Sequence, residues 1–198
     1  MKDSRESIVI LIDGPNFYNI ARIMAIRVDY LKLINILTTE RRVVAKTIFC
    51  KLPHSNSIRC FHRKLKRKYH LKVICGQYID QNIDYLLQEE IEYFSNRDDV
   101  DTIVLIAGDG GYFDNLNHAH QDHQKKIEVY AIKEVLNHDY FSNGFKLIDL
   151  RELRPFIAED ILSRKKRIGP TGKKRHTNHR KNENQQPSRR LRKKQRSF

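Results

Sequence analysis

The stretch that decides the fold of this chain is Ser7-Ile-Val-Ile-Leu-Ile-Asp-Gly-Pro-Asn16. Its residues 8–12 are five consecutive apolar side chains, most of them β-branched, which is typical of a strand buried on both faces of a parallel sheet. Residues 13–16 have the composition of a tight turn followed by the first turn of a helix. Apolar residues at helical spacing follow from Phe17 to Met24, so the stretch predicts a strand, a turn and a helix.

The same pattern recurs along the chain and predicts an α/β fold. A second apolar run, Thr102–Ala107, ends at Gly108-Asp109-Gly110-Gly111 and is again followed by helical spacing. Weaker patterns predict strands at 43–50, 71–75, 127–132 and 147–148, and helices at 30–37, 58–69, 83–94 and 112–123. Strands that alternate with helices form right-handed crossovers, so we expect a three-layer fold with a mostly parallel central sheet. The two most apolar strands are expected to be central neighbours.

Charge divides the chain into two parts. The 198 residues carry a formal net charge of +14, yet residues 163–198 alone hold fifteen Lys and Arg against a single acid, Glu183. Residues 1–162 therefore contain 23 basic and 23 acidic residues and have no net charge. Because the terminal segment has too few apolar residues to bury a core, we expect one domain, residues 1–160, and a disordered basic tail, residues 161–198. Such a tail attracts polyanions.

Composition argues against two classes of protein. The longest early apolar run has five residues, which is too short for a signal-peptide core or a membrane span. Cys50, Cys60 and Cys75 are an odd number without metal-ligand spacing, so a disulfide framework is not expected. We therefore expect a reducing, intracellular compartment and predict a cytoplasmic protein that does not bind membranes.

Acidic residues follow both apolar strands. Parallel strands place their carboxyl ends at one edge of the sheet, so Asp13 and Asp109 are expected to converge there. Asp84, at the start of a predicted helix, and Glu90, with Glu89 as an alternative, are candidates to complete the site. Carboxylates without cysteine ligands favour Mg²⁺ or Mn²⁺, which can polarise a phosphate and activate water for phosphodiester cleavage. The competing interpretation is that Asp13 and Asp109 only cap the helices that follow them.

Three segments resemble the motifs of a known family in their order and spacing. Residues 8–19 resemble the opening motif of NYN domains, the PIN-like nucleases that include the LabA-like branch. Ile83-Asp84, with Glu90 six positions after the aspartate, resembles the middle motif, and residues 102–113 resemble the third. The resemblance covers about residues 7–155 and implies a PIN-like fold, a divalent-metal site and RNA cleavage. It implies that Asn16 braces the site or contacts substrate, and that the catalytic and metal-binding residues are Asp13, Asp84, Glu90 and Asp109.

Two departures from the family pattern bear on activity. The third motif commonly carries a second acid two residues after its aspartate, and this chain has Gly111 there, with Asp114 as a candidate replacement. A basic residue often stands three positions before the middle aspartate, and this chain has Gln81. The leading hypothesis is a Mg²⁺- or Mn²⁺-dependent ribonuclease. The alternative is a catalytically weakened or inactive NYN-domain protein that binds RNA or has a regulatory role.

Basic residues and histidines supply further candidate sites. Residues 59–72 contain seven Lys and Arg and no acid, which favours a nucleic-acid contact, with a solvated helix face as the competing interpretation. The candidate RNA-binding side chains are Arg59, Arg63, Lys64, Lys66, Arg67 and Lys68. Among three clustered histidines, His120 and His123 have the spacing to share a metal ion, and a solvent-exposed helix face is the competing interpretation.

Overall fold

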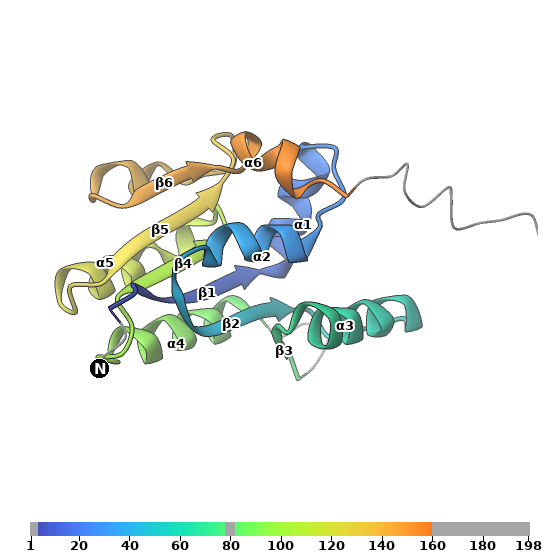
Figure 1. Cartoon of the computed structure of the whole chain (residues 1–198), viewed down its shortest axis with the longest axis horizontal. Helices are drawn as coiled ribbons and strands as arrows, with labels where there is room; N and C mark the ends of the chain where they lie inside the picture. Colours follow the sequence, from blue (N-terminus) through green and yellow to red (C-terminus); the bar gives the residue numbers. More distant parts are fainter. Residues whose placement is uncertain (1–3, 78–81, 160–198) are drawn as a thin grey trace, which may run out of the picture. The chain divides into compact units, whose positions relative to one another are not determined.

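The computed structural model describes residues 4–77 and 82–159, which form an α/β unit around a six-stranded sheet (Figure 1). The strands lie in the order β3-β2-β1-β4-β5-β6, and every neighbouring pair is parallel. Their bounds are β1 Ser7–Asp13, β2 Arg42–Cys50, β3 Lys72–Cys75, β4 Thr102–Ile106, β5 Lys126–Ala131 and β6 Lys146–Asp149. The predicted fold class is confirmed, and β1 and β4 are central neighbours as expected. The predicted tail, residues 161–198, lies outside the described residues.

Helices cover both faces of this sheet. They are α1 Gly14–Ile23, α2 Tyr30–Thr38, α3 Asn56–Tyr69, α4 Asp84–Ser95, α5 Phe113–Gln121 and α6 Leu150–Ile157. Side chains alternate along β1, so that Ile8, Ile10 and Ile12 pack with α1, α2, α3 and α6. Val9 and Leu11 point to the opposite face and pack with α4 and α5. The apolar run of β1 is therefore buried on both faces, as a central parallel strand requires.

Most element boundaries lie close to those predicted, with three differences. The predicted helix 112–123 is a 3-10 turn, η1 Gly110–Tyr112, followed by α5, which ends at Gln121. Sequence patterns did not indicate α6, because this short helix contains Pro155 and buries only Leu150 and Ile157. A second 3-10 turn, η2 His138–Ser142, was not predicted either.

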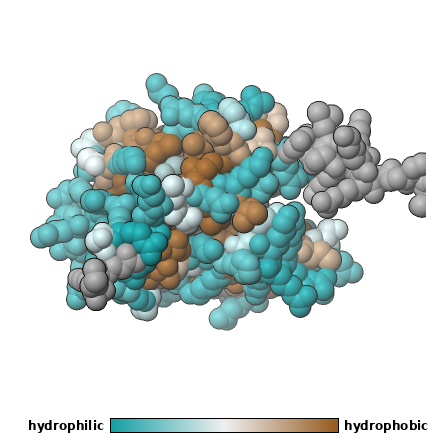
Figure 2. All heavy atoms as spheres, viewed as in Figure 1, coloured by the Kyte–Doolittle hydropathy of each residue, from teal (hydrophilic) through white to brown (hydrophobic). Residues whose placement is uncertain are grey.

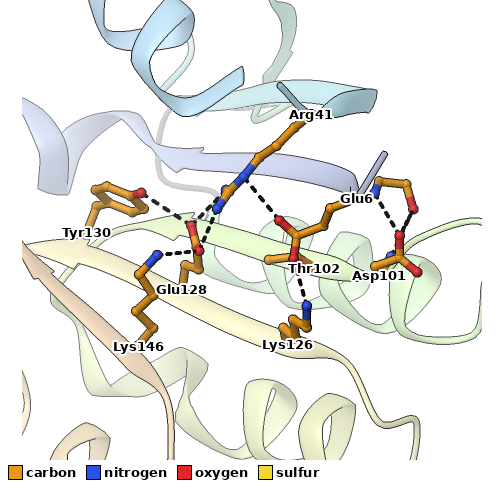
Figure 3. A network of polar contacts seen from close by, with 9 residues as sticks. Glu6, Arg41, Asp101, Thr102, Lys126, Glu128, Tyr130 and Lys146 are labelled. Atoms are coloured by element: carbon orange, nitrogen blue, oxygen red, sulfur yellow. Dashed lines mark hydrogen bonds and ion pairs between the residues drawn. The ribbon is translucent and has the colours of Figure 1, made fainter. Parts of the chain in front are cut away.

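A polar network ties together the amino ends of the strands (Figure 3). Glu128 on β5 is buried and accepts hydrogen bonds of 2.9 and 2.8 Å from the Arg41 guanidinium and one of 2.9 Å from Lys146. Close by, Glu6 accepts hydrogen bonds of 2.9 and 3.1 Å from the first residues of β4 and β5. Burial opposes ionisation of Glu128, but the bonds from Arg41 and Lys146 outweigh it and lower its pKa to about 2. The network stabilises the edge of the sheet opposite to the carboxyl ends of the strands.

The surface is hydrophilic over most of the face seen in Figure 2. Apolar side chains reach it between α2 and α6, where Ile36 and Phe156 line a shallow hollow. Within the described ranges, none of the helices is both long enough and apolar enough to cross a membrane.

Candidate functional site

Asp13 lies at the carboxyl end of β1, where the chain turns into α1. Its Oδ1 accepts the backbone N–H of Asn16 at 3.0 Å, so Asp13 does cap α1, as one of the two interpretations requires. Unlike most capping residues it is buried, with only 4% of its surface exposed. Gly14 makes this packing possible, because a Cβ atom there would overlap the carbonyl group of Phe49 at the end of β2. The turn therefore holds a buried carboxylate at the carboxyl edge of the sheet.

The Tyr112 hydroxyl connects Asp13 with Asp84. Its oxygen lies 2.7 Å from Asp13 Oδ2 and 2.9 Å from Asp84 Oδ1. Tyr112 is buried at the end of η1, whereas Asp84 begins α4, so three segments distant in sequence meet at this phenol. The sequence patterns did not indicate a site role for Tyr112. Its place directly after the Gly108–Gly111 turn is the only sequence signal that points to it.

Asp109 lies on the turn that follows β4. Three side chains hold the backbone of this turn through hydrogen bonds: Tyr140 Oη to the Asp109 carbonyl oxygen (2.6 Å), Asn16 Oδ1 from the Gly108 N–H (3.1 Å) and Gln88 Nε2 to the Gly111 carbonyl oxygen (2.7 Å). They come from η2, α1 and α4, which pack around the turn. The Asp109 side chain itself is exposed and accepts the Gly111 N–H at 2.9 Å. A rigid turn thus presents this carboxylate to solvent.

Negative charge is concentrated at this edge. Burial raises the pKa of Asp13, and the charges of Asp84 and Asp109 raise it further. Within residues 4–77 and 82–159, no lysine or arginine forms an ion pair with these three aspartates. A phenol carries a single proton, so Tyr112 forms hydrogen bonds with both carboxyl groups only when one of them is protonated.

The donor set fits a hard divalent cation. Asp13, Asp84 and Asp109 offer carboxylate oxygens, the ligands that Mg²⁺ and Mn²⁺ prefer. Asp84 Oδ2 and Asp109 Oδ2 have no hydrogen-bond partner in the part of the chain that the structure describes. A cation at this edge would also offset the negative charges of Asp84 and Asp109 that raise the pKa of Asp13. The residues present therefore fit the divalent metal that the NYN resemblance implies.

Glu90 lies away from this edge. Helix α4 starts at Asp84 and runs back along the sheet, so the six intervening steps carry Glu90 about 9 Å along the helix axis. Its Oε1 accepts a hydrogen bond of 2.8 Å from Lys72, the first residue of β3. The structure therefore joins Asp13 and Asp84 through one phenol, places Asp109 close enough for its charge to raise the pKa of Asp13, and pairs the fourth predicted acid with a lysine. The two alternatives, Glu89 and Asp114, are exposed on α4 and α5.

Helix α3 places the predicted basic residues near the carboxyl edge. His62, in the middle of α3, has its Nδ1 atom 3.5 Å from Sγ of Cys75, the last residue of β3. Figure 1 accordingly shows α3 beyond the arrowhead of β2. Leu65 and Tyr69 face the core, and Lys64 is half-buried. The basic side chains left exposed are Arg59, Arg63, Lys66, Arg67 and Lys68.

Comparisons with known proteins bear on the fold and the family of this chain. A solved protein of unknown function from Vibrio parahaemolyticus RIMD 2210633 is 22% identical, with a TM-score of 0.67, and the match covers 76% of this chain and 96% of that chain. This similarity shows a shared fold. Homoserine dehydrogenase from S. aureus at pH 7.0 is 16% identical over 73% of this chain and 32% of that chain, and its TM-score of 0.32 is too low to support an argument. No curated protein matches. The family model of the NYN domain matches residues 7–150, and the chain therefore belongs to the NYN domain family of PIN-like nucleases.

Proposed function

We propose that this chain is a Mg²⁺- or Mn²⁺-dependent ribonuclease that acts at the carboxyl edge of the sheet. The observation that carries the proposal is the meeting of Asp13 and Asp84 at the buried Tyr112, with the charge of Asp109 acting on the same carboxylate, in a fold of the nuclease kind. When bound, the cation would supply charge to polarise the scissile phosphate and to lower the pKa of the attacking water.

The residues of the site have separate roles in this proposal. The carboxylates of Asp84 and Asp109, each with a free oxygen, bind the cation together with Asp13. Tyr112 sets the spacing between two of these carboxylates through its hydroxyl contacts of 2.7 and 2.9 Å. Asn16 acts as a positioning residue, because it links α1 to the turn that carries Asp109. Glu90 stays a predicted ligand that would have to leave Lys72 to reach the cation.

RNA is the substrate that the charge distribution favours. The exposed basic residues of α3 form a positive surface near an acidic edge, and phosphate groups bind such a surface without regard to base sequence. The proposed path of the RNA backbone runs along α3 toward Asp109. The tail, whose fifteen positive charges lie outside the described residues, would add long-range attraction.

Cleavage of a labelled single-stranded RNA in Mn²⁺ tests the proposal. We expect Asp13→Asn, Asp84→Asn and Asp109→Asn each to lower the rate by at least about a hundredfold, because charge stabilisation of several kcal/mol is removed. Asp98→Asn is the matched control, since Asp98 is exposed just before β4 at the opposite edge. An inert wild-type protein, or variants at Asp13 and Asp109 that cleave as fast as the control, would contradict a nuclease site here. A smaller loss in Glu90→Gln would fit its pairing with Lys72.

The alternative is an RNA-binding protein with little or no activity, and Gly111 favours it. A Cβ atom at this position would lie 3.4 Å from Asp109 Oδ1 and meets no other atom within 4 Å. An aspartate therefore fits at position 111 and would add a carboxylate next to the existing three. Cleavage that appears only in Gly111→Asp, with RNA binding unchanged, would identify the natural chain as the degenerate form.

A further inference from the structure

A second cluster of ligand-type side chains lies at the opposite end of the sheet from Asp13. Glu92 lies near the end of α4, His118 near the end of α5, and His123 in the turn that leads to β5. Nitrogen and oxygen atoms of these three residues all lie within 4.8 Å of one another. Among residues 4–77 and 82–159, this is the one trio of His, Cys or acidic side chains that meets this condition. We propose that Glu92, His118 and His123 form a Zn²⁺ site that joins α4 to the end of α5.

Two of the three distances between the ligand atoms are close to those of a tetrahedral zinc site. Zinc lies about 2.0–2.2 Å from histidine nitrogen and carboxylate oxygen, so ligand atoms around it are about 3.3–3.6 Å apart. In this structure His118 Nε2 lies 3.3 Å from His123 Nε2 and 3.7 Å from Glu92 Oε1. The second distance is too long for a hydrogen bond, whereas both are close to the edge length of the tetrahedron. The third distance, between Glu92 and His123, is at most 4.8 Å, so an ion would draw these two side chains toward His118.

Asp122 orients the central ligand of the trio. Its Oδ2 lies 2.6 Å from His118 Nδ1, one helical turn along the chain. With the Nδ1 proton donated to this carboxylate, His118 Nε2 carries its lone pair toward Glu92 and His123. A histidine held by a carboxylate on its far nitrogen is the usual arrangement behind a zinc ligand. Glu92 is held too, because its Oε1 accepts a hydrogen bond of 3.2 Å from Asn96.

The pair of histidines in the proposed site differs from the pair whose spacing the sequence singled out. His120 does not belong to the cluster, because its Nδ1 contacts the Lys125 carbonyl oxygen at 2.8 Å on another side of α5. His118 and His123 lie against each other instead, with ring centroids 4.9 Å apart and nearly perpendicular rings. The turn after α5 brings about this pairing, since His123 lies beyond the last helical residue, Gln121.

The two sites would select different cations. The trio offers two nitrogens and one oxygen, which suit a borderline ion such as Zn²⁺, whereas the three aspartates offer only hard oxygen ligands. With side chains of Glu92 and His118 nearly half exposed, at 46% and 45%, the fourth position is open to water and the ion can exchange with solvent. Its expected effect is to stabilise the contact between α4 and α5 at the edge remote from Asp13.

Titration of the full chain with Co²⁺, a coloured substitute for Zn²⁺, tests the proposal. We expect the visible absorption of a tetrahedral cobalt complex at one equivalent, its displacement by Zn²⁺, and a melting temperature that rises with Zn²⁺ concentration. His118→Ala and His123→Ala should abolish the tetrahedral spectrum. His54→Ala is the matched control, since His54 is an exposed histidine in the loop before α3, and it should bind as the wild type does. Asp122→Asn should weaken binding by about 10- to 100-fold.

Two results would overturn the zinc site. One is the absence of a tetrahedral spectrum in the wild-type chain, and the other is an undiminished spectrum in His118→Ala. Because both ligand histidines are at least partly exposed, their alanine variants are expected to fold, and circular dichroism checks this. The measurement needs no RNA cleavage, so its outcome is independent of the proposed nuclease activity.

Discussion

Replacing the buried Glu128 by glutamine should remove the centre of the polar network in Figure 3. Glutamine keeps the shape of the side chain but not its charge. Arg41, with 19% of its side chain exposed, then loses a carboxylate that accepts two of its hydrogen bonds, and Lys146 loses its partner on β5. We therefore expect Glu128→Gln to fold, with a lower free energy of unfolding.

The magnitude follows from the pKa of Glu128, which the structure lowers from 4.5 to about 2. Each pKa unit corresponds to 1.36 kcal/mol, so the ionised carboxylate contributes about 3 kcal/mol to the stability of the folded state. Because the folded-state pKa lies below the unfolded one, this contribution is complete above pH 4.5 and is lost as the pH falls toward 2. A loss of this size agrees with the cost of breaking a buried ion pair.

Urea unfolding at a series of pH values measures the effect. At pH 7 the free energy of unfolding of Glu128→Gln should lie about 3 kcal/mol below that of the wild type. The difference should shrink steadily as the pH is lowered from 4.5 to 2. Glu152→Gln, an exposed glutamate on α6, is the control and should change stability by less than about 0.5 kcal/mol. A difference below about 1 kcal/mol at pH 7, or one that does not depend on pH, would refute the argument.

Three further predictions concern the site, the fold and the tail. In the presence of a chelator, Tyr112→Phe should lower the free energy of unfolding by about 2 kcal/mol, because the buried Asp13 loses a hydrogen bond. In thermal melts, added Mn²⁺ should raise the stability of this variant more than that of the wild type. Gly14→Ala should lower the free energy of unfolding by about 1–3 kcal/mol, because the new Cβ atom overlaps the Phe49 carbonyl group, whereas Gly111→Ala should leave stability nearly unchanged. Equal melting temperatures for the two variants would contradict this expectation. Deletion of residues 163–198 should weaken RNA binding, as measured by fluorescence anisotropy. The slope of log K for RNA binding against log salt concentration should become less steep by about 0.7 for each phosphate that the tail no longer neutralises. An unchanged slope would assign the tail another role.

Much of the fold could be predicted because its signals are local. The apolar runs of β1 and β4 are continuous since both faces of each strand are buried, and that requirement is visible in a window of six residues. The alternation with helices then leads to a parallel sheet, in which Asp13 and Asp109 must lie at one edge. Helix α6 was not predicted because it buries only two side chains, which is too few to form a periodic apolar pattern.

The composition of the candidate site depends on contacts between segments that no pattern connects. Asp13 and Tyr112 are 99 positions apart, and their hydrogen bond exists because η1 and β1 end at the same edge of the sheet. The resemblance to the family motif assigned Glu90 to the same site as Asp84, but six helical positions separate the two residues along the axis of α4 and leave Glu90 with Lys72.

The sequence by itself determined which strands are buried, that two aspartates share an edge, and that the body is neutral while the tail is basic. The tertiary structure alone decided which side chains meet there: Tyr112 between two carboxylates, and Glu92 from α4 facing His118 and His123. The physical reason is that burial of one face of a helix or strand requires apolar residues at a regular spacing, which can be read from the sequence. A polar contact between distant segments depends instead on helix lengths, the angles at which elements cross, and turn geometry, none of which a single residue determines.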